Sequence, residues 1–311
     1  MFNTNFKSML ELIQAFPTEE SCIKYLEQIL WDGEPVSPFD PESKIYRCKE
    51  GRYKCKNTGK YFTVRTGTMY DGTKIGLQKW FLAIWLVTCH KKGISSLQLG
   101  RDLNISQKGA WFLLQRIRVC LSVENDSELE GVVEIDETFV GGKNKNRHKD
   151  KKVPMSQGRS YKDKVPVLGM LERGGNLTCV VVCDTKRETI QPLVRKFVKP
   201  DSKVVTDEWH AYNGLNDIFE HHIVNHGKKE YVNLQDNSIH SNSIEGFWGI
   251  FKRGMIGIYN HTSKKHLPLY VNEFVFRYNM RKHPESDKFN WMVANSGIRT
   301  KYMDIKCQEK S

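Results

Sequence analysis

The chain lacks the cysteine pairs that mark disulfide frameworks and intact zinc sites. Its eight cysteines are scattered over 311 residues, and no two of them form a C-x-x-C pair. This spacing favours a reducing, intracellular setting over an extracellular one. The chain can bury a substantial core, since 39% of its residues are hydrophobic and seven are tryptophan.

Long apolar runs are missing as well. The longest, "WFLAIWLVTC" from Trp80 to Cys89, is about half of the roughly 20 residues that a membrane span needs. The N-terminus has no signal-peptide pattern, and the chain has no internal repeat or long low-complexity segment. We therefore expect a soluble, cytoplasmic protein with no membrane partner.

Acidic residues are too few to balance the basic ones. The chain has 48 Lys and Arg against 36 Asp and Glu, which gives a net charge of +12 and a pI near 9.2. A charge of this sign and size points to a polyanionic partner such as nucleic acid.

The pattern of apolar residues divides the chain into five segments. Residues 1–30 have helical spacing and predict a short lead-in, whereas residues 31–72 hold strand-like pieces separated by Gly and Asn. Residues 73–125 are helical, residues 131–285 combine strands and helices, and residues 286–311 are expected to form a C-terminal tail. The length itself favours about two domains.

Within the helical segment, "SSLQLGRDLN" and "SQKGAWFLLQRIRVC" predict two helices joined at Ile105-Ser106, each with a serine placed to cap it. This is the length of a DNA-binding helix-turn-helix, whose second helix would present Gln107, Lys108 and Trp111 near its start. An ordinary helical hairpin is the alternative.

The segment 131–285 has the element order of a ribonuclease-H-like α/β domain. The stretches "GVVEIDETFVGG", "VPVLGMLE" and "LTCVVVCDT" predict three strands, with a hairpin turn at residues 173–176. A helix at "ETIQPLVRKFV", strands at "SKVVTDEW" and "HHIVNH", and helices around "SIEGFWGIFKRGM" and "KKHLPLYVNEFVFRYNMRK" follow. We interpret the order as three strands, helix, strand, helix, strand, helix.

Three acidic residues stand where these elements could aim them at one point. Asp136 lies within an apolar strand, Asp207 ends a second short strand, and Glu245 begins a helix, with Lys252 two turns further along the same face. Two-metal phosphoryl-transfer enzymes need such hard oxygen ligands on rigid elements. Taken singly, each acid has a structural alternative as a turn, cap or helix-dipole residue. By strand alternation Glu134 shares the face of Asp136, whereas Glu137 points to the other.

Longer stretches resemble the ISXO-like group of DDE-type insertion-sequence transposases. They include "YFTVRTGTMYDGTKIGLQKWFLAIWL", "GISSLQLGRDLNISQKGAWFLLQRIR", "EIDETFVGGK", "VTDEWHAYNGL" and "HSNSIEGFWGIFKRG", and they cover roughly residues 45–285 in order. The resemblance implies a ribonuclease-H-like core in which Asp136, Asp207 and a third residue bind two divalent cations, Mg²⁺ or Mn²⁺. Glu245 is the expected third ligand and Asn242 the alternative.

The resemblance also implies partners and a reaction. The chain is expected to bind terminal inverted repeats and target DNA as a homodimer or larger oligomer at the bacterial nucleoid, cutting the element's end and joining it to the target. Lys252 is expected to contact DNA, His210 to orient a phosphate or water or to pack beside Trp209, and Glu134 to assist Asp136. The basic residues Lys143, Lys145 and Arg147 begin a lysine-rich loop next to the proposed ligands, so they are expected to contact DNA, although such a run can be only a solvated loop.

One segment departs from the family pattern. Relatives carry two C-x-x-C pairs in residues 31–72, but this chain has "SPFD" and "CKNT" at those places. Zinc is therefore not expected, and this degenerate zinc-ribbon-like segment is expected to keep its shape through packing of Tyr46, Tyr53, Tyr61 and Phe62. Two other functions stay open: a decayed or domesticated copy that binds DNA without catalysis, and a structure-specific nuclease with the same core.

Overall fold

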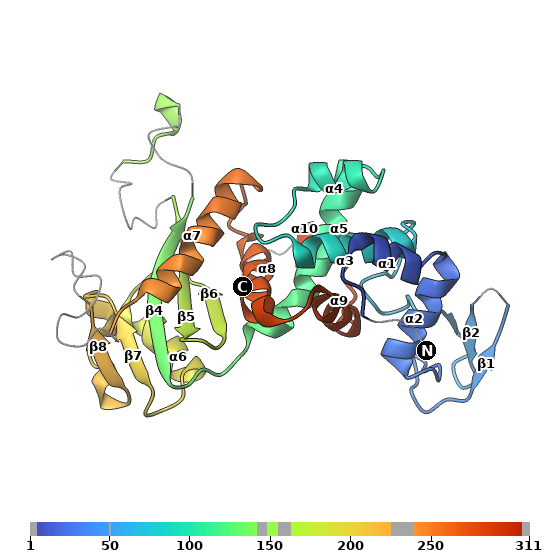
Figure 1. Ribbon diagram of the computed structural model, residues 1–311, viewed down its shortest axis with the longest axis horizontal. Helices are drawn as coiled ribbons and strands as arrows, with labels where there is room; N and C mark the ends of the chain where they lie inside the picture. The colour runs from blue at the N-terminus through green and yellow to red at the C-terminus, as the bar shows by residue number, and fades with distance from the viewer. Residues whose placement is uncertain (1–4, 50, 142–147, 155–162, 225–238, 307–311) are drawn as a thin grey trace. The chain divides into compact units, whose positions relative to one another are not determined.

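The computed structural model describes residues 5–49, 51–141, 148–154, 163–224 and 239–306 (Figure 1). The chain forms two compact units. The first comprises Met1–Val123 together with Lys282–Ser311, and the second comprises Glu124–Arg281.

The first unit is mainly helical. Its helices are α1 (Met9–Ala15), α2 (Glu19–Trp31), α3 (Leu77–Cys89), α4 (Ser96–Asp102), α5 (Gln107–Cys120), α9 (Glu285–Ala294) and α10 (Tyr302–Lys306). The core contains a cluster of aromatic rings from distant parts of the chain, in which Phe289 of α9 lies within 5.1–6.1 Å of Phe6, Phe16 and Phe81. The segment interpreted from the sequence as a tail thus supplies core residues, because Phe289, Met292 and Val293 recur at helical spacing.

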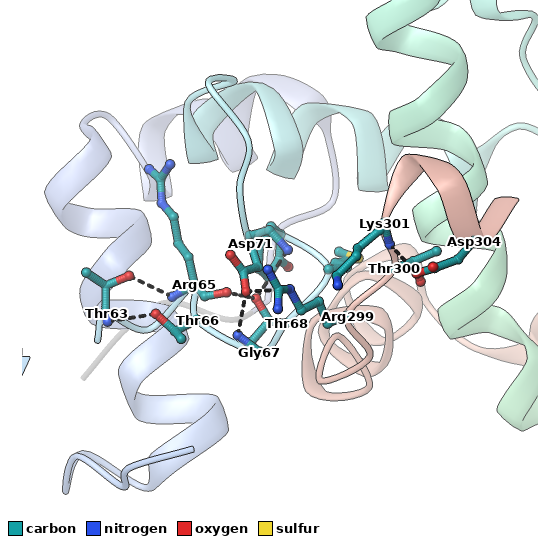
Figure 2. Close-up of polar contacts among 12 residues, drawn as sticks. Thr63, Arg65, Thr66, Gly67, Thr68, Asp71, Arg299, Thr300, Lys301 and Asp304 are labelled. Atoms are coloured by element: carbon teal, nitrogen blue, oxygen red, sulfur yellow. Dashed lines mark hydrogen bonds and ion pairs between the residues drawn. The ribbon is translucent and has the colours of Figure 1, made fainter. Parts of the chain in front are cut away.

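The C-terminal segment is held to the loop before α3 by polar contacts (Figure 2). Arg299 Nε lies 2.8 Å from Asp71 Oδ2, which also accepts a hydrogen bond from the Gly67 amide. Arg116, which is 6% exposed, donates to the carbonyl oxygens of Met69 and Thr300. A buried guanidinium with carbonyl partners on both segments fixes them to each other.

A small antiparallel sheet also belongs to the first unit. Its strands are β1 (Ile45–Arg47), β2 (Tyr53–Cys55) and β3 (Tyr61–Phe62), in the order β1-β2-β3. Tyr53 and Phe62 pack against each other as predicted, and both rings also contact Trp31. The prediction was wrong for Tyr46 and Tyr61, which are 43% and 51% exposed, because strand alternation turns them to the opposite face.

The second unit is built on a mixed five-stranded sheet. Its strands are β4 (Val132–Val140), β5 (Val165–Glu172), β6 (Leu177–Val181), β7 (Lys203–Thr206) and β8 (Glu220–Ile223). The spatial order is β6-β5-β4-β7-β8, in which β4, β7 and β8 are parallel and β5 is antiparallel to both of its neighbours. The chain is therefore an α/β protein, as the sequence predicted.

Helices cover both faces of this sheet. Helix α6 (Arg187–Phe197) packs on the face that carries Val133 and Ile135, whereas α7 (Asn242–Gly257) and α8 (Leu267–Asn279) pack on the other. Gly169 of β5 permits the close approach of α7, since a Cβ there would lie 2.5 Å from the Trp248 ring.

The connection between β7 and β8 differs from the predicted order. The interpreted element order has a helix between these two strands, but the connection contains two 3-10 turns, His210–Tyr212 and Leu215–Asp217. Within the described ranges, no helix combines the length and apolar character that crossing a bilayer requires.

Candidate active site

Strands β4 and β7 bring Asp136 and Asp207 together. The parallel pairing sets Glu134 opposite Val205, and the same register carried two residues further along places Asp207 beside Asp136. Strand β7 ends at Thr206, while β4 continues to Val140. Beyond Thr206, β4 therefore has no paired strand on the β7 side among the described residues, and the two carboxylates lie at this point.

Glu137 joins the two aspartates. One carboxylate oxygen from each of Asp136, Glu137 and Asp207 lies within 4.8 Å of the other two. Tyr212 Oη donates to Glu137 Oε1 at 2.7 Å, and the Trp209 amide donates to Asp207 Oδ1 at 3.0 Å. Burial, followed by the charge of Glu137, raises the pKa of Tyr212 well above its usual value, so Tyr212 is protonated and remains a donor.

The sequence did not predict this role for Glu137. Alternation does put Glu137 on the face opposite Asp136, next to Ile135 and Tyr212. However, β7 ends at Thr206, so side chains from both faces of β4 can reach the edge beyond it. The Glu137 carboxylate therefore still lies beside those of Asp136 and Asp207. The sequence feature that could have predicted this contact is the short strand β7, which ends beside the longer strand β4 with its three acidic residues.

Helix α7 carries Glu245 and Asn242 on its exposed side near its start. Glu245 accepts a hydrogen bond from Ser241 Oγ at 3.3 Å. In the part of the chain that the structure describes, the acidic group consists of Asp136, Glu137 and Asp207 and does not include Glu245. The assignment of Glu245 or Asn242 as the third ligand therefore stays a prediction.

Glu134 is engaged in a buried network rather than in the acidic group. Its side chain is 0% exposed, and Oε2 accepts hydrogen bonds from the amides of Ser243 and Ile244 at the start of α7, at 2.9 and 3.0 Å. Arg173 Nε donates to Oε1 at 3.0 Å, and the same guanidinium donates to the His240 carbonyl at 2.9 Å. Glu134 thus anchors α7 to β4, and its expected assistance to Asp136 stays a prediction.

The remaining candidates for DNA contact in this unit differ in what surrounds them. Lys252 is exposed and lines a cavity of about 370 Å³ beside Phe139 and Phe251. His210 is exposed, and the centroid of its ring lies 4.1 Å from that of Trp209, so both roles expected for it stay predictions. Lys143, Lys145 and Arg147 lie outside the described residues.

Helices α4 and α5 are joined by a short turn. Ser95 and Ser106 accept hydrogen bonds from Gln98 and Gly109, which confirms the predicted caps. The close approach depends on Gly100, where a Cβ would lie 3.1 Å from the Ile105 carbonyl oxygen.

The predicted contact residues of α5 have neighbours within the first unit. Gln107 donates to Ser96 Oγ at 2.8 Å, Lys108 Nζ lies 5.4 Å from the Tyr302 ring centroid, and Trp111 meets the same ring edge-on. Gln107 and Lys108 remain exposed, whereas Trp111 is half-buried.

Hydroxyl groups surround Cys55 on the inner side of the small sheet. The thiol is buried, which by itself raises the pKa of Cys55, but hydrogen bonds from Ser43, Thr58 and Ser37 outweigh this and lower it to about 6. Within the described ranges, no three His, Cys, Asp or Glu ligands converge here. A ribbon without zinc stays a prediction.

The segment that holds both aspartates matches a known domain family. Residues 128–279 match the ISXO2-like transposase domain. An uncharacterized transposase-like protein of Haemophilus influenzae is 35% identical over 101 residues, which make up 32% of this chain and 78% of that protein. The chain belongs to the ISXO2-like transposase family. This confirms the resemblance seen in "EIDETFVGGK" and "NSIEGFWGIFKRG", both of which lie within the matched residues.

Similarity to a second relative extends over most of the chain. An uncharacterized protein in transposable element ISH50 of Halobacterium salinarum is 28% identical over 297 residues, which cover 91% of this chain and 99% of that protein. The crystal structure of the Mos1 strand transfer complex matches 71% of this chain and 79% of its own, at 12% identity and a TM-score of 0.28. A TM-score this low does not establish a common fold.

Within this ISXO2-like domain, Glu134→Ala is expected to lower the free energy of unfolding by about 3–5 kcal/mol. The substitution leaves the Arg173 guanidinium and the first amides of α7 without their buried partner. Urea unfolding followed by tryptophan fluorescence measures the loss. Glu130→Ala is the matched control, because that carboxylate is 63% exposed and pairs only with Lys199 among the contacts of its side chain that the structure shows. Equal effects of the two substitutions would contradict an anchoring role for Glu134.

Proposed function

We propose that the chain is an active DNA transposase that cuts the ends of an insertion sequence and joins them to target DNA. The observation that carries the proposal is the convergence of Asp136, Glu137 and Asp207, on an α/β domain of a transposase family. The strand order β6-β5-β4-β7-β8, with only β5 reversed relative to its neighbours β4 and β6, supports a ribonuclease-H-like assignment of this domain.

The donor set suits divalent cations such as Mg²⁺ or Mn²⁺. Three carboxylates with ligand atoms within 4.8 Å of one another repel each other unless a cation lies between them. When bound, a pair of such cations supplies an activated water and stabilises the leaving oxygen of the cut phosphodiester. Asp136 and Asp207 are the proposed ligands from the sheet, and Glu245 is the proposed ligand from α7.

The surrounding residues hold these ligands in place. The Trp209 amide donates a hydrogen bond to one oxygen of Asp207, and Tyr212 donates one to an oxygen of Glu137, so both side chains are oriented by neighbouring groups. Glu134 holds the start of α7, which carries Glu245, against strand β4. Catalysis by this arrangement depends on prepositioning, which lowers the entropic part of the barrier.

DNA is the proposed substrate and partner. Gln107 and Lys108 are exposed at the start of α5, and we propose that they contact the terminal inverted repeats as part of a helix-turn-helix. Lys252 is proposed to contact the DNA strand that is cut. Lys143, Lys145 and Arg147, which lie outside the described residues, are also proposed to contact DNA. A homodimer or larger oligomer would hold the two ends of one element.

Strand transfer tests the proposal directly. A labelled terminal-repeat duplex, a target plasmid and Mg²⁺ are incubated with the purified chain, and products are separated on denaturing gels. We expect cleavage at the repeat end and joined products, neither of which forms in EDTA. Cleavage without joining would instead indicate a structure-specific nuclease, and binding without cleavage would indicate a decayed copy.

A further inference from the structure

The outer face of the small three-stranded sheet carries two tyrosines and a lysine in one row. Tyr46 is paired with Lys54, and Lys54 is paired with Tyr61, so their side chains project from the same face. Both tyrosines are exposed, at 43% and 51%. The buried Tyr53 and Phe62 form the opposite face, so the packing of the sheet does not require the outer rings.

Basic side chains surround this row. The Arg52 guanidinium lies 5.0 Å and Lys54 Nζ lies 5.5 Å from the centroid of the Tyr61 ring, and Lys44 Nζ lies 5.8 Å from that of Tyr46. Between residues 44 and 60 the sequence holds seven Lys or Arg and only one acidic residue. Lys44, Arg52 and Lys54 therefore make the face positive as well as aromatic.

Strand propensity alone does not account for this composition. Tyrosine is favoured at exposed strand positions, which explains the two rings singly. It does not explain why Lys44, Arg52 and Lys54 lie together beside these rings, since like charges at close range cost stability. A surface of this kind fits a partner that supplies phosphates for the cations and flat, partly apolar groups for the rings.

We infer that the face formed by Tyr46, Lys54 and Tyr61 is a docking surface for duplex DNA. The identity of the polyanion rests on the proposed function. Neighbouring strands are about 4.8 Å apart, and a ribbon of two such strands fits within a major groove about 12 Å wide. Lys44, Arg52 and Lys54 contact phosphates, and the two rings lie against sugars and base edges.

Fluorescence anisotropy with a labelled terminal-repeat duplex in EDTA tests this surface without requiring catalysis. Tyr46→Ser/Tyr61→Ser is expected to weaken binding by about 10-fold or more, while Tyr46→Phe/Tyr61→Phe, which keeps both rings, retains most of the affinity. Removing the three cations by Lys44→Ala/Arg52→Ala/Lys54→Ala is expected to reduce the slope of log affinity against log salt by about 2–3, since each phosphate contact contributes about 0.9.

The matched charge control removes two lysines and one arginine that lie exposed on or next to α6, Lys186, Arg195 and Lys196. This variant is expected to keep the wild-type salt slope, and an equal loss would overturn the inference. Unchanged duplex affinity of the serine variant, or a loss seen only with single-stranded DNA, would overturn it too. If the wild-type chain bound no duplex, the proposed function would fail together with this surface.

Discussion

Asp136→Asn and Asp207→Asn are each expected to reduce strand transfer by about 1,000-fold or more, which corresponds to about 4 kcal/mol of transition-state stabilisation. Asparagine keeps the shape of the side chain and can still accept the hydrogen bond that the Trp209 amide gives to residue 207. Only the negative charge that would hold a cation is lost. The loss should therefore appear in catalysis and not in DNA binding, which anisotropy in EDTA measures.

The thermal midpoint gives a second readout of the same substitutions. In the absence of cations the three carboxylates repel each other, so either asparagine variant is expected to melt at the same temperature as the wild type or higher. Adding Mg²⁺ or Mn²⁺ should raise the midpoint of the wild type by mass action and that of the variants much less. Full strand transfer by Asp136→Asn would rule out the proposed mechanism.

The sequence predicted those parts of the fold that depend on local pattern. Apolar alternation located β4 and β5, serine caps located α4 and α5, and the acidic strand followed by a second acidic strand end predicted that Asp136 and Asp207 meet. These predictions need only the period of an element and the rule that parallel strands end at one edge.

Features that depend on tertiary packing were not predictable in the same way. Glu134 shares a face with Asp136, but its partners are the start of α7 and Arg173, which lie 109 and 39 residues away in the sequence. Glu137 lies on the wrong face by alternation and still reaches the acidic group because β7 is short. A period of two says which side a residue faces; it does not say where the neighbouring strand stops.

The third ligand is decided by comparing Glu245→Gln, Glu137→Gln and Asn242→Ala. We expect Glu245→Gln to reduce strand transfer by about 1,000-fold and Glu137→Gln by only about 10-fold. The reason is that Glu137 accepts a hydrogen bond from the buried Tyr212. Glutamine can accept the same hydrogen bond, so this substitution keeps the packing beside the two aspartates. Glu245 is exposed and begins the helix that Glu134 anchors beside β4, so bound cations can draw its carboxylate in.

The outcomes separate three assignments. Loss of activity mainly in Glu137→Gln would identify Glu137 of β4 as the third ligand. Loss mainly in Asn242→Ala would identify Asn242, whose neutral amide oxygen binds a cation less strongly. Titrating Mg²⁺ distinguishes a ligand from a wall residue, because removing a ligand raises the cation concentration needed for half-maximal rate, whereas removing a wall residue lowers the maximal rate at saturating cation. Glu245→Gln is expected to do the former in addition to lowering the maximum. An unchanged Mg²⁺ requirement in Glu245→Gln would contradict the assignment of Glu245 as a ligand. Removing the charge of a carboxylate that binds the cation must weaken the affinity of the site for Mg²⁺.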